Sequence, residues 1–224
     1  MLFSRILVYS LGMMINFFGV ALVIYSTLGT GFWSALFVGL SENVALTAGF
    51  WYGLFQFIFI FVNARLMGAR PEVAALIPLV LESFVYDFWL EVVFGGLNMA
   101  AAPFYMQLGM FSGGLLAIGL GVALYILPMF PRAPVDQLFL AVSERFNIGL
   151  GISQTIVAAG AATAGLLVGG PVGWGTLVIT VLLGPVIQFW HEKLVFIFPE
   201  FHEQAIANAE TVEAGSEYTP ETVN

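Results

Sequence analysis

The stretch STLGTGFWSALFVGLSEN, residues 26–43, and the stretch PMFPRAPVDQLFLAVSERFN, residues 128–147, decide the fold of this chain. Each begins with Gly or Pro residues, continues with about ten apolar residues and ends near a Ser-Glu pair. Ten apolar residues are too few to cross a bilayer, which needs about 20. The sequence therefore predicts two short helices, either re-entrant or interfacial, and both alternatives stay open.

The two stretches belong to an internal repeat with an offset of 102 residues. GVAL at 19–22 recurs at 121–124, and the Ser-Glu pair at 41–42 recurs at 143–144. No single match is strong, because apolar sequences agree by chance. A register that holds across whole halves of the chain is stronger support for a duplicated unit.

The repeat defines two halves, about residues 10–92 and 112–193, each with three long apolar segments. Because three is odd, the second half must enter the membrane from the opposite side. The predicted fold class is an all-α membrane protein with six transmembrane helices in two inverted-topology three-helix repeats, each with a short interfacial or re-entrant helix. Many secondary transporters are built this way, with the solute site near the midplane.

Six segments are long and apolar enough to span a bilayer. They cover about residues 6–27, 46–64, 73–94, 108–129, 150–168 and 175–198. If the N-terminus is cytoplasmic, all six Lys and Arg lie inside, because the loops 28–45, 95–107 and 169–174 contain none. The positive-inside rule then predicts that both termini lie in the cytoplasm.

Composition excludes several other classes. Of the 224 residues, 60% are hydrophobic and 9% are charged, against about 25% charged in soluble domains. Six basic residues offer no surface for nucleic acid, and the absence of Cys excludes thiol chemistry. Residues 200–224 hold six Glu and no basic residue, which predicts a disordered cytoplasmic tail after a bundle formed by 1–199. The expected partners are the lipid bilayer and an unknown small solute, and a homodimer is left open.

Three motifs resemble those of the YczE/YitT-type bacterial integral membrane proteins. They are LGTGFWSALFVGLS, APVDQLFLAVSERFNIGLGISQT and GGPVGWGTLVITVLLGPVIQF, within a resemblance that covers residues 10–193. The family pattern LG-x-x-PWD is altered here, because Phe32 replaces Pro and Ser34 replaces Asp, whereas the second motif keeps Pro134 and Asp136. The resemblance implies a fold and a location in the bacterial cell (inner) membrane, but no substrate.

Acidic residues inside a span are candidates for function. The third span holds Glu82, Asp87 and Glu91 without an intramembrane Lys or Arg. Such acids must be protonated, hydrated in a cavity or bound to cations. Glu82 and Asp87 are therefore predicted to couple protons or cations, while Glu91 is interpreted as reaching the outer interface. A one-residue slip in the repeat aligns residues 80–91 with residues 181–192 and so pairs Asp87 with Gln188. We expect this pair to face one cavity.

The predicted substrate-binding residues are Trp33, Ser34, Asp87, Asp136 and Gln188. Asp136 falls in the first turn of a short helix, where the dipole favours negative charge, and Ser34 occupies the matching position of the other half. Trp33 is either an interfacial anchor or the wall of a solute pocket. No cofactor or metal site is predicted, because the His191-Glu192 pair lacks the second His of a zinc-protease motif.

The function predicted from these features is transport of a small solute by alternating access, with proton or cation coupling. The alternative is a membrane-embedded assembly or regulatory subunit without transport activity. The protein is not expected to be an enzyme, because the sequence shows no nucleophile–base pair and no metal ligand set.

Overall fold

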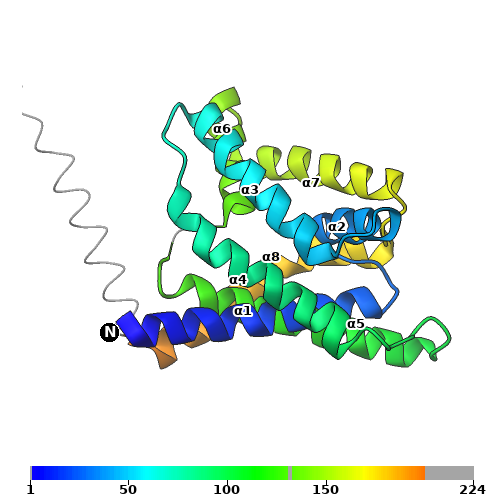
Figure 1. The fold of residues 1–224 in the computed structure, drawn as a ribbon. Helices are drawn as coiled ribbons and strands as arrows, with labels where there is room; N and C mark the ends of the chain where they lie inside the picture. Colours follow the sequence, from blue (N-terminus) through cyan, green and yellow to red (C-terminus); the bar gives the residue numbers. More distant parts are fainter. Residues whose placement is uncertain (1, 131–132, 200–224) are drawn as a thin grey trace, which may run out of the picture.

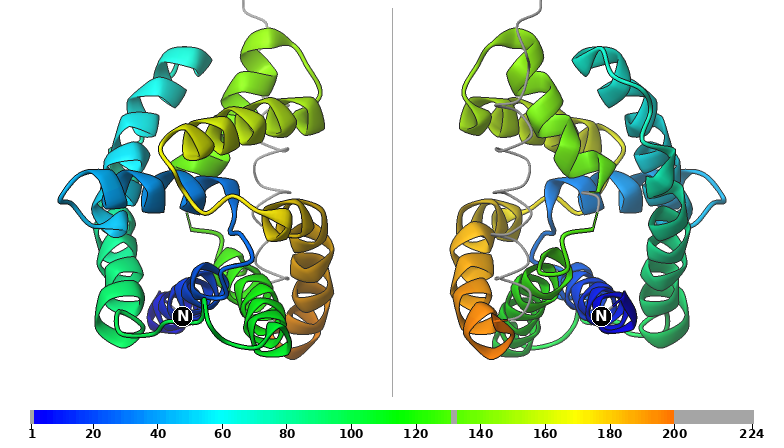
Figure 2. Two further views of the ribbon diagram at one scale, coloured as in Figure 1. Left: turned by 90° about the vertical axis from the view of Figure 1, so that its right-hand side faces the viewer. Right: turned by 90° about the vertical axis from the view of Figure 1, so that its left-hand side faces the viewer.

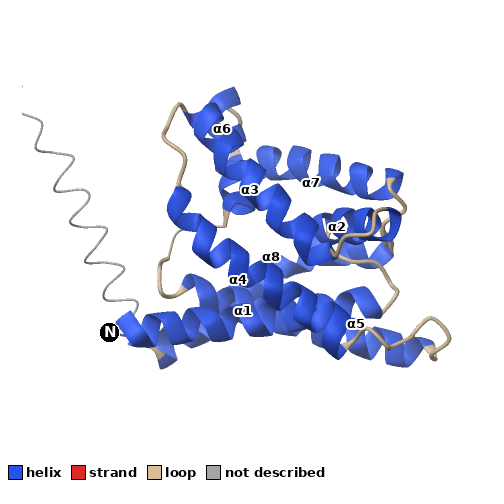
Figure 3. Cartoon of the chain, viewed as in Figure 1, coloured by secondary structure: helices blue, strands red, loops and turns tan. Residues whose placement is uncertain are grey.

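The computed structural model describes residues 2–130 and 133–199, and its regular elements are helices (Figures 1 and 3). The α-helices are α1 (Leu2–Tyr25), α2 (Phe32–Asn43), α3 (Ala48–Met67), α4 (Leu76–Asp87), α5 (Phe104–Ile126), α6 (Pro134–Phe146), α7 (Leu150–Leu167) and α8 (Trp174–Ile197). A 3₁₀ turn, η1 (Val73–Ala75), leads into α4, and a π-helical segment, η2 (Phe88–Val93), continues it. The predicted acidic tail, 200–224, lies outside the described residues.

Six of these helical segments are long and apolar enough to cross a membrane. They are Phe3–Tyr25, Ala48–Met67, Val73–Val93, Phe104–Ile126, Leu150–Leu167 and Trp174–Ile197. All six spans predicted from the sequence are thus confirmed as helices, with ends shifted by a few residues. The two predicted short helices are also present, as α2 and α6.

Helices α1 and α5 form the central pair, and they cross with close backbone contact. Gly12 of α1 lies against Gly121 of α5, and Gly19 lies against Gly114, so the two helices run antiparallel. A methyl group on Gly121 would overlap the backbone nitrogen of Asn16. Small residues at such crossings allow the close van der Waals packing that holds membrane helices together.

The remaining helices form two groups around this pair. Helices α4 and α8 lie on opposite sides of α1 and α5 (Figure 2). A second layer contains α2, α3, α6 and α7, in which α2 packs on α7 and α3 packs on α6. Helix α3 also packs along α4, whereas α7 makes no comparable contact with α8. The fold is therefore closed between α3 and α4 and loose between α7 and α8.

The break between α1 and α2 is held by a loop from the other half of the chain. The N–H of Thr30 donates to the carbonyl of Pro171 (3.0 Å), and the N–H of Gly175 donates to that of Leu28 (2.8 Å). Gly29 has a φ of 108°, a conformation that strains residues with a Cβ. The segment 169–175 is thus a tight loop that fixes where α2 begins.

Candidate functional site

The first turns of α2 and α6 meet at a cavity in the centre of the protein. Two adjoining hollows, of about 150 Å³ and 520 Å³, share Val20, Trp33, Ser34 and Asp136 in their walls. Trp33 and Ser34 belong to the first turn of α2, and Asp136 belongs to the first turn of α6. The structure therefore brings together three of the five predicted binding residues.

The smaller hollow has mostly aromatic walls. The rings that line it are Phe17, Trp33, Phe37, Tyr52, Phe59, Tyr86 and Tyr125. Trp33 stacks on Phe37 with 13° between the ring planes, and Phe17 stacks on Tyr86 with centroids 5.1 Å apart. Such ring pairs constrain one another, so the hollow has a defined shape rather than a collapsible one.

The larger hollow occupies the loose region between α7 and α8. Its walls include Gln154, Thr155 and Ala158 from α7, and Thr180 and Gly184 from α8. Most of its lining is apolar. Helices α7 and α8 are therefore separated by a cavity, and this cavity adjoins the aromatic hollow.

Glu82 is a buried acid that hydrogen-bonds to tyrosines from two other helices. Its side chain is 4% exposed. The hydroxyls of Tyr9 on α1 (2.9 Å) and Tyr52 on α3 donate to its carboxylate. Glu82 also interacts electrostatically with Asp136 across the centre. A carboxylate buried in this way is favoured when it holds a proton or faces a cation.

Two polar residues of α3 hold the start of α6. The amide of Gln56 donates to the Tyr52 hydroxyl (2.7 Å), and its oxygen accepts from the N–H of Val135 (2.8 Å). Asn63 donates to the carbonyl of Pro134 (2.7 Å). A continuous chain of hydrogen bonds therefore links Glu82 to the first turn of α6. Our sequence analysis missed Gln56 and Asn63, although their spacing of seven places two polar residues on one face of an apolar helix.

The prediction that Asp87 and Gln188 face one cavity is wrong. The Asp87 carboxylate accepts from the Thr47 hydroxyl (2.6 Å) and the Gly49 N–H (2.7 Å), so it anchors the start of α3. It lines a separate groove that runs along the contact between α3 and α4. Gln188 is exposed on α8 and donates to Glu192 (3.0 Å). Asp87 therefore does not share a cavity with Asp136, and its place beside two cap donors indicates a structural role.

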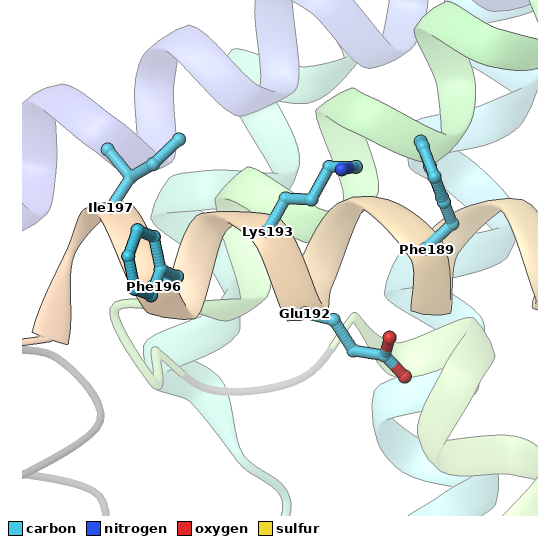
Figure 4. A pocket seen from close by; sticks show the side chains of 5 residues that line it. All are labelled: Phe189, Glu192, Lys193, Phe196 and Ile197. Carbon is cyan, nitrogen blue, oxygen red and sulfur yellow. The ribbon is translucent and has the colours of Figure 1, made fainter.

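A groove near the end of α8 is distinct from the central cavity. Its walls are Phe189, Glu192, Lys193, Phe196 and Ile197, all from one helix, and Lys193 and Glu192 point to different sides of that helix (Figure 4). The Lys193 ammonium lies 4.9 Å from the centroid of the Phe189 ring. A surface formed by one helix face cannot enclose a solute, so we regard the central cavity as the candidate site.

Six apolar helices and a set of buried polar groups at their centre define a multi-pass membrane protein. Residues 3–192 match the family model described as "Family of unknown function (DUF6198)", and the chain belongs to this family. The predicted relationship to YczE-type membrane proteins is confirmed.

Three relatives span most of the chain. "Uncharacterized protein YyaS" of Bacillus subtilis is 35% identical over 179 residues, which cover 80% of this chain and 88% of the relative. "Uncharacterized membrane protein YczE" of the same organism is 28% identical, with 81% and 82% covered. An "Uncharacterized protein" of Haemophilus influenzae is 26% identical, with 77% and 76% covered. No solved structure matches the chain.

Proposed function

We propose that the protein is a secondary transporter that moves a small solute by alternating access between two inverted repeats. The observation that carries the proposal is that two interrupted short helices begin at one central cavity. Paired helix interruptions at membrane depth are typical of solute sites in inverted-repeat transporters. The same observation favours the re-entrant alternative for α2 and α6, because a helix lying on the surface would not start at the centre.

The packing of α1 on α5 supports the inverted repeat. In the sequence repeat, the offset of 102 residues makes Gly12 equivalent to Gly114 and Gly19 equivalent to Gly121. In the structure, Gly12 instead contacts Gly121, and Gly19 contacts Gly114. That reciprocal pattern is what a two-fold axis between antiparallel helices produces. The repeat also makes α2 equivalent to α6 and α7 equivalent to α3. The contact of α2 with α7 therefore corresponds to the contact of α6 with α3, and both are present.

The contacts of α4 and α8 depart from this relation, since α8 also packs more fully on α5 than α4 does on α1, and this departure supports alternating access. Helix α3 packs along α4, but the equivalent helices α7 and α8 are separated by the larger hollow. A transporter with two equivalent gates has this asymmetry when one gate is closed and the other is open. We infer a second state in which α8 closes on α7 while α4 separates from α3.

We assign proton coupling to Glu82, which lies on the helix that this change would move. A carboxylate only accepts hydrogen bonds, and here it accepts them from Tyr9 and Tyr52. Protonation turns one of its oxygens into a donor and weakens the link between α4 and α3. Proton binding at Glu82 would therefore favour the state in which these helices separate.

Paired cysteines test the alternating gates, because the chain has no Cys of its own. A Cβ on Gly53 would lie 3.4 Å from the Cβ of Ser83, close to the usual disulfide range, so Gly53→Cys with Ser83→Cys should cross-link α3 to α4. The equivalent residues across the open gate are Thr155 and Gly184. Thr155→Cys with Gly184→Cys should cross-link only in the second state.

We expect the two disulfides to exclude each other in a protein that carries all four cysteines. Thiol labelling of oxidised protein in vesicles would measure this, with reduced protein as the control. A protein in which the Thr155–Gly184 pair never forms would be an immobile subunit, and one in which both disulfides form together would lack alternating gates. Either result contradicts the proposal.

We further propose that both termini face the cytoplasm of a bacterial inner membrane. The distribution of basic residues supports this orientation, and the N-terminus and the end of α8 lie at the same end of the bundle (Figure 1). Reporter fusions at Asn224 and within the 95–107 loop should label opposite sides of the membrane. Labelling on the same side would contradict the inverted topology.

A further inference from the structure

The first turns of α2 and α6 border the same cavity, but their backbone donors are satisfied differently. Helix α6 begins with Pro134, which has no N–H, and the N–H of Val135 donates to Gln56. The N–H of Asp136 donates to the carbonyl of Ala133 (2.9 Å), and the acidic side chain lies at the positive end of its own helix. The start of α6 thus needs no further acceptor.

The start of α2 lacks each of these features. Its N-cap residue, Gly31, has no side chain, and the N–H groups of Phe32, Trp33 and Ser34 have no acceptor within residues 2–130 and 133–199. The repeat places Ser34 where α6 has Asp136. It also places Ala158 where α3 has Gln56, and that alanine lines the cavity.

Two side-chain donors at the same cavity also lack acceptors. The hydroxyl of Tyr86 and the indole N–H of Trp33 are both buried atoms with no hydrogen-bond partner in the described part of the chain. Tyr86 is 1% exposed, and its hydroxyl lies near the Ser34 side chain, although no hydrogen bond of ordinary geometry joins the two. Buried donors without acceptors are costly. Two of them beside a helix start with three further N–H groups that lack acceptors indicate that a ligand supplies the acceptor atoms.

We propose that a small monocarboxylate binds with its carboxylate on the first turn of α2, where the Tyr86 hydroxyl and the Trp33 indole also donate. Helix N-termini bind carboxylates because their N–H groups and the helix dipole both favour negative charge. The aromatic walls would hold the apolar body of the solute. A multiply charged anion fits poorly, because the described lining of both hollows contains no Lys, Arg or His.

This inference names the substrate class of the proposed transporter and rests on that function for its role as cargo. The titratable groups in the wall of the aromatic hollow are Tyr52, Tyr86, Tyr125 and Asp136. Glu82 and Tyr9 lie outside this wall, where Glu82 accepts hydrogen bonds from Tyr52 and Tyr9. A bound carboxylate would add one negative charge to this region. Uptake of a proton with each solute would cancel that charge, which agrees with proton coupling.

Ligand binding to the purified full-length protein tests the proposal directly. Isothermal titration would compare lactate, isovalerate and benzoate, each beside its own primary amide, which has the same shape without the charge. We expect at least one carboxylate to bind about tenfold more tightly than its amide. Equal affinity for all three pairs would overturn the proposal, as would binding of choline or benzylamine without any carboxylate.

Substitutions at Ser34 locate the site. Ser34→Asp would place a carboxylate of the protein on the vacant turn of α2, and we expect it to weaken ligand binding by about tenfold or more. Ser34→Asn makes the same change in side-chain size without the charge, so the loss of affinity caused by the negative charge is the difference between the Asp and Asn variants. Unchanged binding by Ser34→Asp would overturn the assignment, and Tyr86→Phe should also weaken binding.

The two proposals can fail separately. If a carboxylate binds but is not taken up into protein-containing vesicles, the proposed binding site is supported and the proposed transport is contradicted. If a neutral or cationic solute is taken up and no carboxylate binds, the proposed transport is supported and the proposed carboxylate site is contradicted.

Discussion

Replacing Glu82 by Gln is expected to remove the pH dependence of the gate equilibrium. The amide resembles the protonated acid in shape and charge, so it loses two charge-assisted hydrogen bonds from Tyr9 and Tyr52. Hydrogen bonds to charged groups contribute about 1.5–3 kcal/mol, so the population with α3 and α4 apart should rise about tenfold or more. The ratio of Thr155–Gly184 to Gly53–Ser83 disulfides, measured in acidic and alkaline buffer, would report the change.

The matched control is Glu91→Gln, which makes the same chemical change on η2. Glu91 is exposed, whereas Glu82 is buried and accepts hydrogen bonds from Tyr9 and Tyr52, so the Glu91 variant should keep the wild-type pH response. A wild-type ratio that does not change with pH would remove proton coupling from the mechanism. If the pH response is lost in Glu91→Gln but kept in Glu82→Gln, the proton-coupling residue is Glu91 and not Glu82.

Replacing Gly121 by Ala is expected to cause the largest loss of stability of any single methyl group added to α5. The new methyl would overlap the backbone of α1 at Asn16, and neither helix can rotate away without losing the contact at Gly19. Overpacking of this kind costs about 3 kcal/mol. Thermal unfolding in detergent, together with the yield of monodisperse protein, would measure it.

Gly113→Ala is the control for that substitution. It lies on the same helix, and a methyl group there meets nothing within 4 Å. Alanine has the higher helix propensity, so this variant should match or slightly exceed the wild type in stability. Equal stability of the two variants would show that the α1–α5 crossing is less tight than the structure indicates.

The sequence allowed the central features of the site to be predicted, because they depend on local signals. Gly and Pro residues before short apolar runs located both interrupted helices, and the repeat placed Ser34 opposite Asp136. Both residues line the cavity. These signals are local because a turn residue acts on its own backbone, whatever packs around it.

The position of Asp87 could not be predicted in the same way. Sequence gives the depth of a residue in a span, but it gives no reference for rotation about the helix axis. Glu82 and Asp87 are five residues apart, which turns their side chains by about 140° at 3.6 residues per turn. Glu82 consequently points toward α1 and the centre, whereas Asp87 meets the cap of α3. Only the packing of neighbouring helices fixes that choice.

The backbone hydrogen bonds between the α1–α2 break and the segment 169–175 have a consequence for biogenesis. Thr30 and Leu28 find their backbone partners in Pro171 and Gly175, which leave the ribosome more than a hundred residues later. During synthesis the first half must therefore wait in the bilayer with α2 unsupported, exposed to quality-control proteases and to premature pairing with other nascent chains. Neither half expressed alone should reach a protease-resistant state, whereas the two halves produced together should complement each other.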